Sequence, residues 1–186
     1  QKASIESAAY LYDMVKAEGD DRNNRQEYTY DCDGNQIPKD VLRIVAGTIA
    51  CDNADDFGVE VREEPGYGET TLSTDQCIDF LKNTFEYEAA DHEAVAEVLD
   101  PEGDDSFLLE DNSFHGLADS LYKASYFVQT GKDEYHFYVE VQPYDEVWNQ
   151  YSTAAIMDIT AHKNDKSEIA GFVFDKVELT KDTQIY

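Results

Sequence analysis

Apolar residues in the first half of the chain recur at helical spacing. From Ser4 to Lys16 they return every three or four positions, which predicts an amphipathic helix. Pro38 suits a first helical position and predicts a second helix over Lys39–Ala50. Ser73–Gln76 matches a capping box and predicts the start of a third helix, and Ala89–Leu99 predicts a fourth. An acidic loop is expected to follow, around the apolar run Phe107–Leu109.

The period changes from about Tyr122 onward, where apolar and polar residues alternate one by one. Tyr135, Phe137, Val139 and Val141 are separated by polar or amphipathic residues, as in a half-buried antiparallel strand. Two polar turns divide this region. We therefore expect two hairpins with strands near residues 122–129, 134–142, 153–162 and 168–179.

Helices followed by strands predict an α+β fold in which N-terminal helices pack on a C-terminal antiparallel sheet of about four strands. The length of 186 residues suits a single domain over residues 1–186. Within it we expect an acidic portion of helices and loops at 52–111 and a sheet portion at 122–181.

Acidic residues are concentrated in the middle of the chain. The whole sequence has 41 Asp and Glu against 14 Lys and Arg, a net charge of −27. Twenty of the acidic residues lie between Asp52 and Asp111, together with only Arg62 and Lys82. Such a concentration costs self-repulsion, so it is better tolerated where the charge has a use.

This charge indicates the kind of partner. Binding of phosphates needs clustered Lys and Arg, so direct binding of nucleic acid is disfavoured. No stretch approaches the ~20 apolar residues of a membrane span. We expect a basic protein surface as the partner, such as the DNA- or RNA-binding groove of a nuclease. The carboxylates expected to contact it are Asp52, Asp55, Asp56, Glu60, Glu63, Glu64, Asp75, Asp79, Glu86, Glu93, Glu97, Asp100, Asp104 and Asp105. Those of the third and fourth predicted helices, Glu86 among them, are expected to form rows on exposed helix faces.

In charge and size the chain resembles the acidic DNA-mimic inhibitors encoded by phages and plasmids. The resemblance implies an inhibitor of a nucleic-acid-binding enzyme, of the anti-restriction or anti-CRISPR class. The alternative is a secreted or lipoprotein-like bacterial binding domain whose acidity is a solvation or salt adaptation. A mimic predicts a contiguous acidic ridge, whereas the alternative predicts carboxylates on all sides and a Cys32–Cys51 disulfide.

No reaction is indicated by the residues, and we expect a protein that is not an enzyme and needs no cofactor. Cys77 lies on the apolar face of its helix, as a structural thiol does. A calcium loop starting at Asp31 needs Gly at its sixth position and Glu at its twelfth. The chain has Gln36 and Leu42 at these positions, so a plain Asp-Gly turn is expected instead. Three cysteines are too few for a disulfide framework, which slightly favours reduced thiols and a cytoplasmic location over export.

Overall fold

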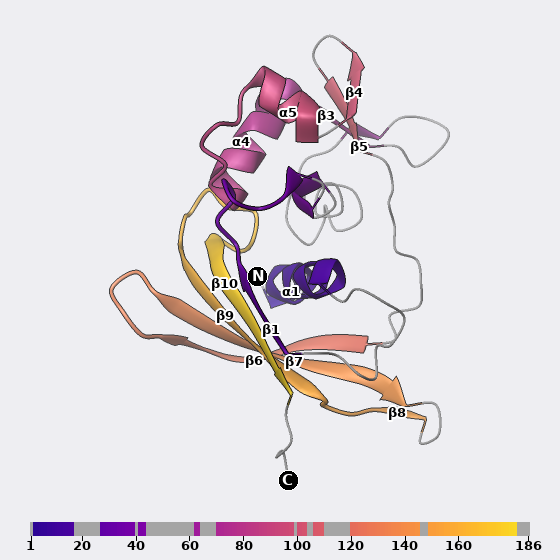
Figure 1. Cartoon of the computed structure of the whole chain (residues 1–186), viewed down its shortest axis with the longest axis vertical. Helices are drawn as coiled ribbons and strands as arrows, with labels where there is room; N and C mark the ends of the chain where they lie inside the picture. Colours follow the sequence, from indigo (N-terminus) through magenta and orange to yellow (C-terminus); the bar gives the residue numbers. More distant parts are fainter. Residues whose placement is uncertain are drawn as a thin grey trace.

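The structure, a computed structural model, describes residues 2–16, 27–39, 41–43, 62–63, 70–98, 100–103, 106–109, 120–145 and 149–181 (Figure 1). These residues form helices and two antiparallel sheets. No helix in this part of the chain is long and apolar enough to cross a membrane.

The larger sheet is built mainly from the two predicted hairpins. β6 (Ser120–Gln129) pairs with β7 (Tyr135–Asp145), and β9 (Ala155–Lys163) pairs with β10 (Phe172–Lys181). β7 and β9 join the hairpins. The expected count of four strands is too low, because two short strands extend the sheet to six. β1 (Tyr28–Asp31) pairs with β10, and β8 (Gln150–Tyr151) pairs with the end of β7.

Alternation along the central strands separates a buried face from an outer face. Val139 on β7 and Ile159 on β9 are fully buried, as are Met157 and Ala161. The intervening residues, such as Tyr138 and Asp158, remain partly exposed on the other face. The sheet therefore has one apolar side, as the two-residue period predicts.

α1 (Lys2–Lys16) covers the apolar face of this sheet (Figure 1). Ile5, Ala8, Leu11 and other residues of its inner stripe are buried in the same core as the strands. Asp13 is also buried, and its carboxylate accepts hydrogen bonds from the hydroxyls of Tyr28 on β1 and Tyr122 on β6. A buried carboxylate is tolerated where such donors replace water, so Asp13 fixes α1 across the sheet.

The remaining elements lie at one end of the large sheet (Figure 1). They are α4 (Thr74–Phe85), α5 (His92–Val98) and a small sheet in the order β2-β3-β5-β4. The strands of this small sheet are β2 (Arg62–Glu63), β3 (Thr70–Ser73), β4 (Asp100–Gly103) and β5 (Ser106–Leu109). The helix predicted at Lys39–Ala50 is seen at residues 39 and 41–43, and its remainder lies outside the described residues.

Two expectations about layout are corrected here. The helices do not all precede the sheet in sequence, because β1, a strand of the large sheet, comes before α4 and α5 along the chain. The segment after α5 is not only an acidic loop: β4 and β5 form a hairpin in which Pro101 lies opposite Phe107. Leu72 of β3 lies opposite Phe107 on the other side and is buried, so pairing with β3 gives this segment its strand structure.

Candidate functional site

α4 holds a row of carboxylates in a fixed position. Its first turn is closed by the predicted capping box, in which the Gln76 amide donates to Ser73 Oγ (3.3 Å) and the Ser73 amide donates to Gln76 Oε1 (3.0 Å). Cys77, Leu81 and Phe85 are buried on its inner face. Asp75 and Asp79 are exposed on the opposite face. Asp75 in the first turn also interacts favourably with the helix dipole.

α5 presents the second group of carboxylates. Asp91 precedes the helix, and its Oδ1 accepts a hydrogen bond from the Ala94 amide (2.9 Å), which caps the N-terminus. Val95 and Val98 are buried, whereas Glu93 and Glu97 are exposed. Glu97 makes an ion pair with Lys39.

The C-terminal end of α4 is a polar joint. Glu86 follows the helix in the left-handed conformation (φ 53°, ψ 34°), and the Tyr87 amide donates to the carbonyl of Leu81 (3.1 Å). A residue with a Cβ adopts this conformation at a cost of roughly 1 kcal/mol. Contacts of the Glu86 side chain with the large sheet accompany this strained position.

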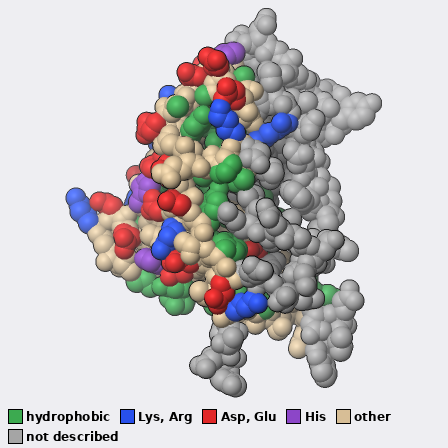
Figure 2. Space-filling view, viewed as in Figure 1, with side chains coloured by type: hydrophobic (Ala, Val, Ile, Leu, Met, Phe, Trp, Pro, Cys, Tyr) green, Lys and Arg blue, Asp and Glu red, His purple; other side chains and the backbone are tan. Residues whose placement is uncertain are grey.

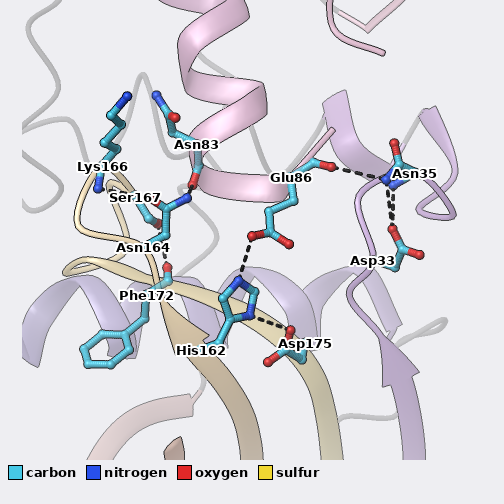
Figure 3. Close-up of polar contacts among 10 residues, drawn as sticks. All are labelled: Asp33, Asn35, Asn83, Glu86, His162, Asn164, Lys166, Ser167, Phe172 and Asp175. Atoms are coloured by element: carbon cyan, nitrogen blue, oxygen red, sulfur yellow. Dashed lines mark hydrogen bonds and ion pairs between the residues drawn. The ribbon is translucent and has the colours of Figure 1, made fainter. Parts of the chain in front are cut away.

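His162 on β9 joins Glu86 to Asp175 on β10 (Figure 3). Its Nε2 lies 2.6 Å from Glu86 Oε1, and its Nδ1 lies 2.8 Å from Asp175 Oδ1. Partial burial alone would lower the pKa of His162, but the hydrogen bonds to both carboxylates outweigh it and raise this pKa above its usual range. With a carboxylate at each nitrogen, the imidazolium form donates on both sides.

The pKa of Asp175 also rises, although its neighbour is a cation. Burial is the main cause; the hydrogen bond from His162 opposes it, and the nearby charges of Glu86 and Asp31 add to it. A favourable contact with His162 therefore coexists with a crowded acidic environment. Both shifts have the same consequence, since in each case the protonated form is favoured by folding.

The Asp31–Asn35 segment is the expected turn, and it packs against this joint (Figure 3). Asp33 Oδ1 accepts hydrogen bonds from the Asn35 amide (3.0 Å) and from Asn35 Nδ2 (3.2 Å). Asn35 also bonds the end of α4: its Nδ2 donates to the Glu86 carbonyl (3.2 Å), and its Oδ1 accepts from the Glu88 amide (3.2 Å). Asn35 thus replaces helical partners that the chain loses where α4 ends.

A small cavity of about 340 Å³ lies between the turn, the end of α4 and β10. Asp31, Asp33, Glu86 and Asp175 line it together with apolar neighbours. Among the described residues, no group of three or more His, Cys, Asp or Glu is arranged to hold a metal ion.

The two described cysteines are buried free thiols. Burial raises the pKa of Cys77 to about 12 and raises the pKa of Cys32 further above its usual value. A protonated, inaccessible thiol is a poor nucleophile, in agreement with the interpretation of Cys77 as structural. Cys51, the partner of Cys32 in the disulfide expected for an exported domain, lies outside the described residues.

The structure describes the side chains of five of the fourteen predicted contact residues. Asp75, Asp79, Glu93 and Glu97 are exposed on α4 and α5, as expected. Glu86 is not on an exposed helix face, because it lies just beyond α4 and its side chain, 45% exposed, is bonded to His162. For Glu63 in β2 and Asp100 in β4 only the strand placement is described. The others, Asp52, Asp55, Asp56, Glu60, Glu64, Asp104 and Asp105, lie outside the described residues.

We predict that His162 makes the stability of the fold depend on pH. Because folding raises its pKa above the ordinary value of 6.5, the stabilisation is complete below that value and is lost as pH rises through the folded-state pKa. His162→Gln is expected to lower the free energy of unfolding by about 1 kcal/mol at pH 6 and by much less at pH 9. Urea unfolding across this pH range would measure the difference.

A second variant tests whether the negative charge of Glu86, rather than the size of its side chain, sets the pKa of His162. Glu86→Gln keeps an oxygen acceptor beside His162 Nε2 but removes one negative charge, so the loss of stability should begin at a lower pH than in the wild type. The histidine titration can be followed directly by NMR. Parallel stability profiles for wild type and His162→Gln would show that this contact does not determine the pH dependence.

Comparison with protein-family models found no match, and neither the search of curated proteins nor that of solved structures found a similar chain.

Proposed function

We propose that this chain is a non-enzymatic binding protein that engages a basic protein groove through an acidic surface, as a DNA mimic does. We define the α4–α5 acidic surface as the exposed side chains Asp75, Asp79, Glu88, Asp91, Glu93 and Glu97. The observation that supports the proposal is its charge density: residues 74–98 contain seven carboxylates and a single lysine, a net charge of −6.

The spacing on the helices suits this function. Asp75 and Asp79 are four residues apart on α4, as are Glu93 and Glu97 on α5, which places each pair on one helix face. Their Cβ atoms are then roughly 5–6 Å apart. Like charges at this separation destabilise an isolated helix by about 0.2–0.5 kcal/mol per pair. The capping box and the Glu86–His162 joint keep α4 in place against that repulsion.

The rest of the described surface is less one-sided in charge. Residues 120–181 contain ten carboxylates and six lysines, a net charge of only −4 over a much longer segment. The face in Figure 2 carries acidic side chains from the α4–α5 end down to the β6–β7 hairpin, with lysines between them over the sheet. A basic groove would therefore be attracted most strongly to α4 and α5.

The basic surface we propose as partner is the DNA- or RNA-binding groove of a nuclease or restriction enzyme.

The proposal predicts that Asp79→Lys/Glu93→Lys weakens inhibition of such an enzyme by ~tenfold or more. Both residues are exposed, so each change should cost less than about 0.5 kcal/mol of stability. The measurement is cleavage of duplex DNA by a panel of nucleases and restriction enzymes, with wild type or variant added. For the wild type, inhibition should also weaken as salt is raised, because exposed charges are then screened.

The matched control is Asp133→Lys/Asp165→Lys. It changes the net charge by the same amount, at exposed turns of the two hairpins that are not part of the α4–α5 acidic surface. It should retain most of the inhibition. Equal losses in the two double variants would mean that only net charge matters. Failure of the wild type to inhibit any enzyme of the panel at low salt would reject the proposal.

A further inference from the structure

β6 is the least acidic part of the described surface. Residues 120–132 form the longest run of the sequence without Asp or Glu, and they contain Lys123 and Lys132. β6 is also the last strand in the order β1-β10-β9-β7-β6, and no other described strand pairs with its outer edge. A long edge strand with free backbone groups is a ready template for another strand unless charges or bulges protect it.

Exposed hydrophobic side chains gather on the same strand. Five large hydrophobic residues are exposed in the described part of the chain, and four of them lie on β6: Leu121, Tyr126, Phe127 and Val128. Phe127 is the most exposed of these, at 62%. The fifth is Tyr151 on β8. Such clustering on one edge is typical of an interaction site, whereas single exposed apolar residues are ordinary.

A groove of about 640 Å³ lies on the α1 side of the large sheet, between β6, the start of α1 and the turn that joins β9 to β10. Residues Ala124–Phe127 form one wall, and Ile5 of α1 and Phe172 of β10 contribute apolar surface to it. Part of the edge is already occupied within the chain, because Glu6 Oε1 of α1 accepts a hydrogen bond from the Ala124 amide (2.8 Å). β6 also has a bulge between Ala124 and Tyr126, which interrupts its regular pairing. Within the described part of the chain, the unoccupied and regular part of the edge is therefore the half toward the hairpin turn, from Tyr126 to Gln129, where three of the exposed hydrophobic residues lie.

We propose that this half of β6 is the interface between two copies of the chain, whose large sheets join edge to edge by antiparallel pairing. An antiparallel edge is complementary to itself under a two-fold axis, so a second copy needs no additional matching surface. Charge also selects this edge. Two molecules of net charge −27 repel each other over most of their surface, and the repulsion is weakest where a strand has no carboxylate. A basic partner would instead be drawn to α4 and α5.

This inference does not depend on the proposed function, and the two have opposite responses to salt. Binding of a basic groove weakens with salt because attraction is screened. Pairing of two acidic copies through an uncharged, apolar edge strengthens with salt because repulsion is screened. We expect the dimer dissociation constant to fall by ~tenfold between about 0.02 M and about 0.5 M salt, where the Debye length shrinks from roughly 20 Å to roughly 4 Å.

The experiment is sedimentation velocity of the full chain over a range of concentrations at both salt levels. The wild type should form dimers that are more abundant at high salt. Val128→Glu places a carboxylate on the free half of the edge and should raise the dissociation constant at least ~tenfold. Tyr151→Glu is the matched control, because Tyr151 is exposed to nearly the same degree (41% against 42% for Val128) but lies on β8. It should dimerise like the wild type.

Hydrogen exchange provides a measurement that does not depend on a variant. In the wild type at high salt, the amides of residues 126–129 should become better protected as the protein concentration rises. A wild type that remains monomeric at every concentration and salt level would overturn the proposal. So would equal weakening by Val128→Glu and Tyr151→Glu, or exchange in β6 that is independent of concentration.

Discussion

Gly34→Ala should lower the free energy of unfolding by about 3 kcal/mol, as overpacking of a closely fitted contact does. A Cβ at this position would lie 1.9 Å from the carbonyl oxygen of Phe85 and 2.8 Å from its carbonyl carbon. The obstacle is backbone at the end of α4, not a side chain that can rotate away. To admit the methyl group, the turn must move off the helix and lose the hydrogen bonds that Asn35 makes there.

Urea unfolding of Gly34→Ala and Gly131→Ala would test this prediction. Gly131 lies in the β6–β7 turn, where a Cβ would approach only the Cβ of Glu134, at 3.3 Å, and its amide, at 3.9 Å. An exposed turn can shift by a few tenths of an ångström, so this control should change stability by less than about 1 kcal/mol. If both variants had the same small effect, Gly34 would not be closely packed against the backbone of α4, and the prediction would be wrong.

Ile159→Ala should lower the free energy of unfolding by about 3–4 kcal/mol, within the range for large-to-small changes in a well-packed core. Ile159 is fully buried on β9, between Phe137 on β7 and Val177 on β10. Both neighbouring strands are fixed by their own pairing, so the space left by the side chain cannot close easily. The loss therefore includes a cavity term as well as the lost apolar contact.

Ile156→Ala on the same strand makes the same chemical change on the opposite face. Ile156 is only partly buried, so this variant should cost about 1 kcal/mol or less. The pair tests which side of the sheet is the core. Equal destabilisation by the two substitutions would show that the outer face is also covered in solution.

The large sheet could be predicted because its strands carry a long, regular pattern. Val139, Val141, Met157 and Ile159 are separated by residues that tolerate water, and a two-residue period over eight or more positions specifies both the strand and its buried face. This pattern does not show which sheet a short strand joins, although Tyr28–Tyr30 is β-prone in sequence. β1 has four residues, and its membership in the sheet depends on pairing with β10, which lies almost at the other end of the sequence.

For the candidate site too, local features could be predicted from the sequence and long-range contacts could not. Helical spacing correctly placed Asp79, Glu93 and Glu97 on exposed faces, because amphipathicity is a local property. The role of Glu86 is not local: its partner His162 is 76 residues away, and nothing in either segment marks the pair. Glu86 also fell at the end of the helix, where pattern alone does not define the boundary.

The pairing of β1 with β10 has a consequence for synthesis on the ribosome. Tyr30 lies opposite Val177, so the first strand of the large sheet cannot pair until the last strand has been made. The contacts of His162 with Glu86 and Asp175 must also wait until β9 and β10 have been made. Chains released before residue 175 would contain every residue of the α4–α5 acidic surface. They would lack Asp175, the β10 residue that His162 contacts while it holds Glu86. Nascent chains should therefore acquire protease resistance late and in one step, because contacts of such long range delay folding until the chain is nearly complete.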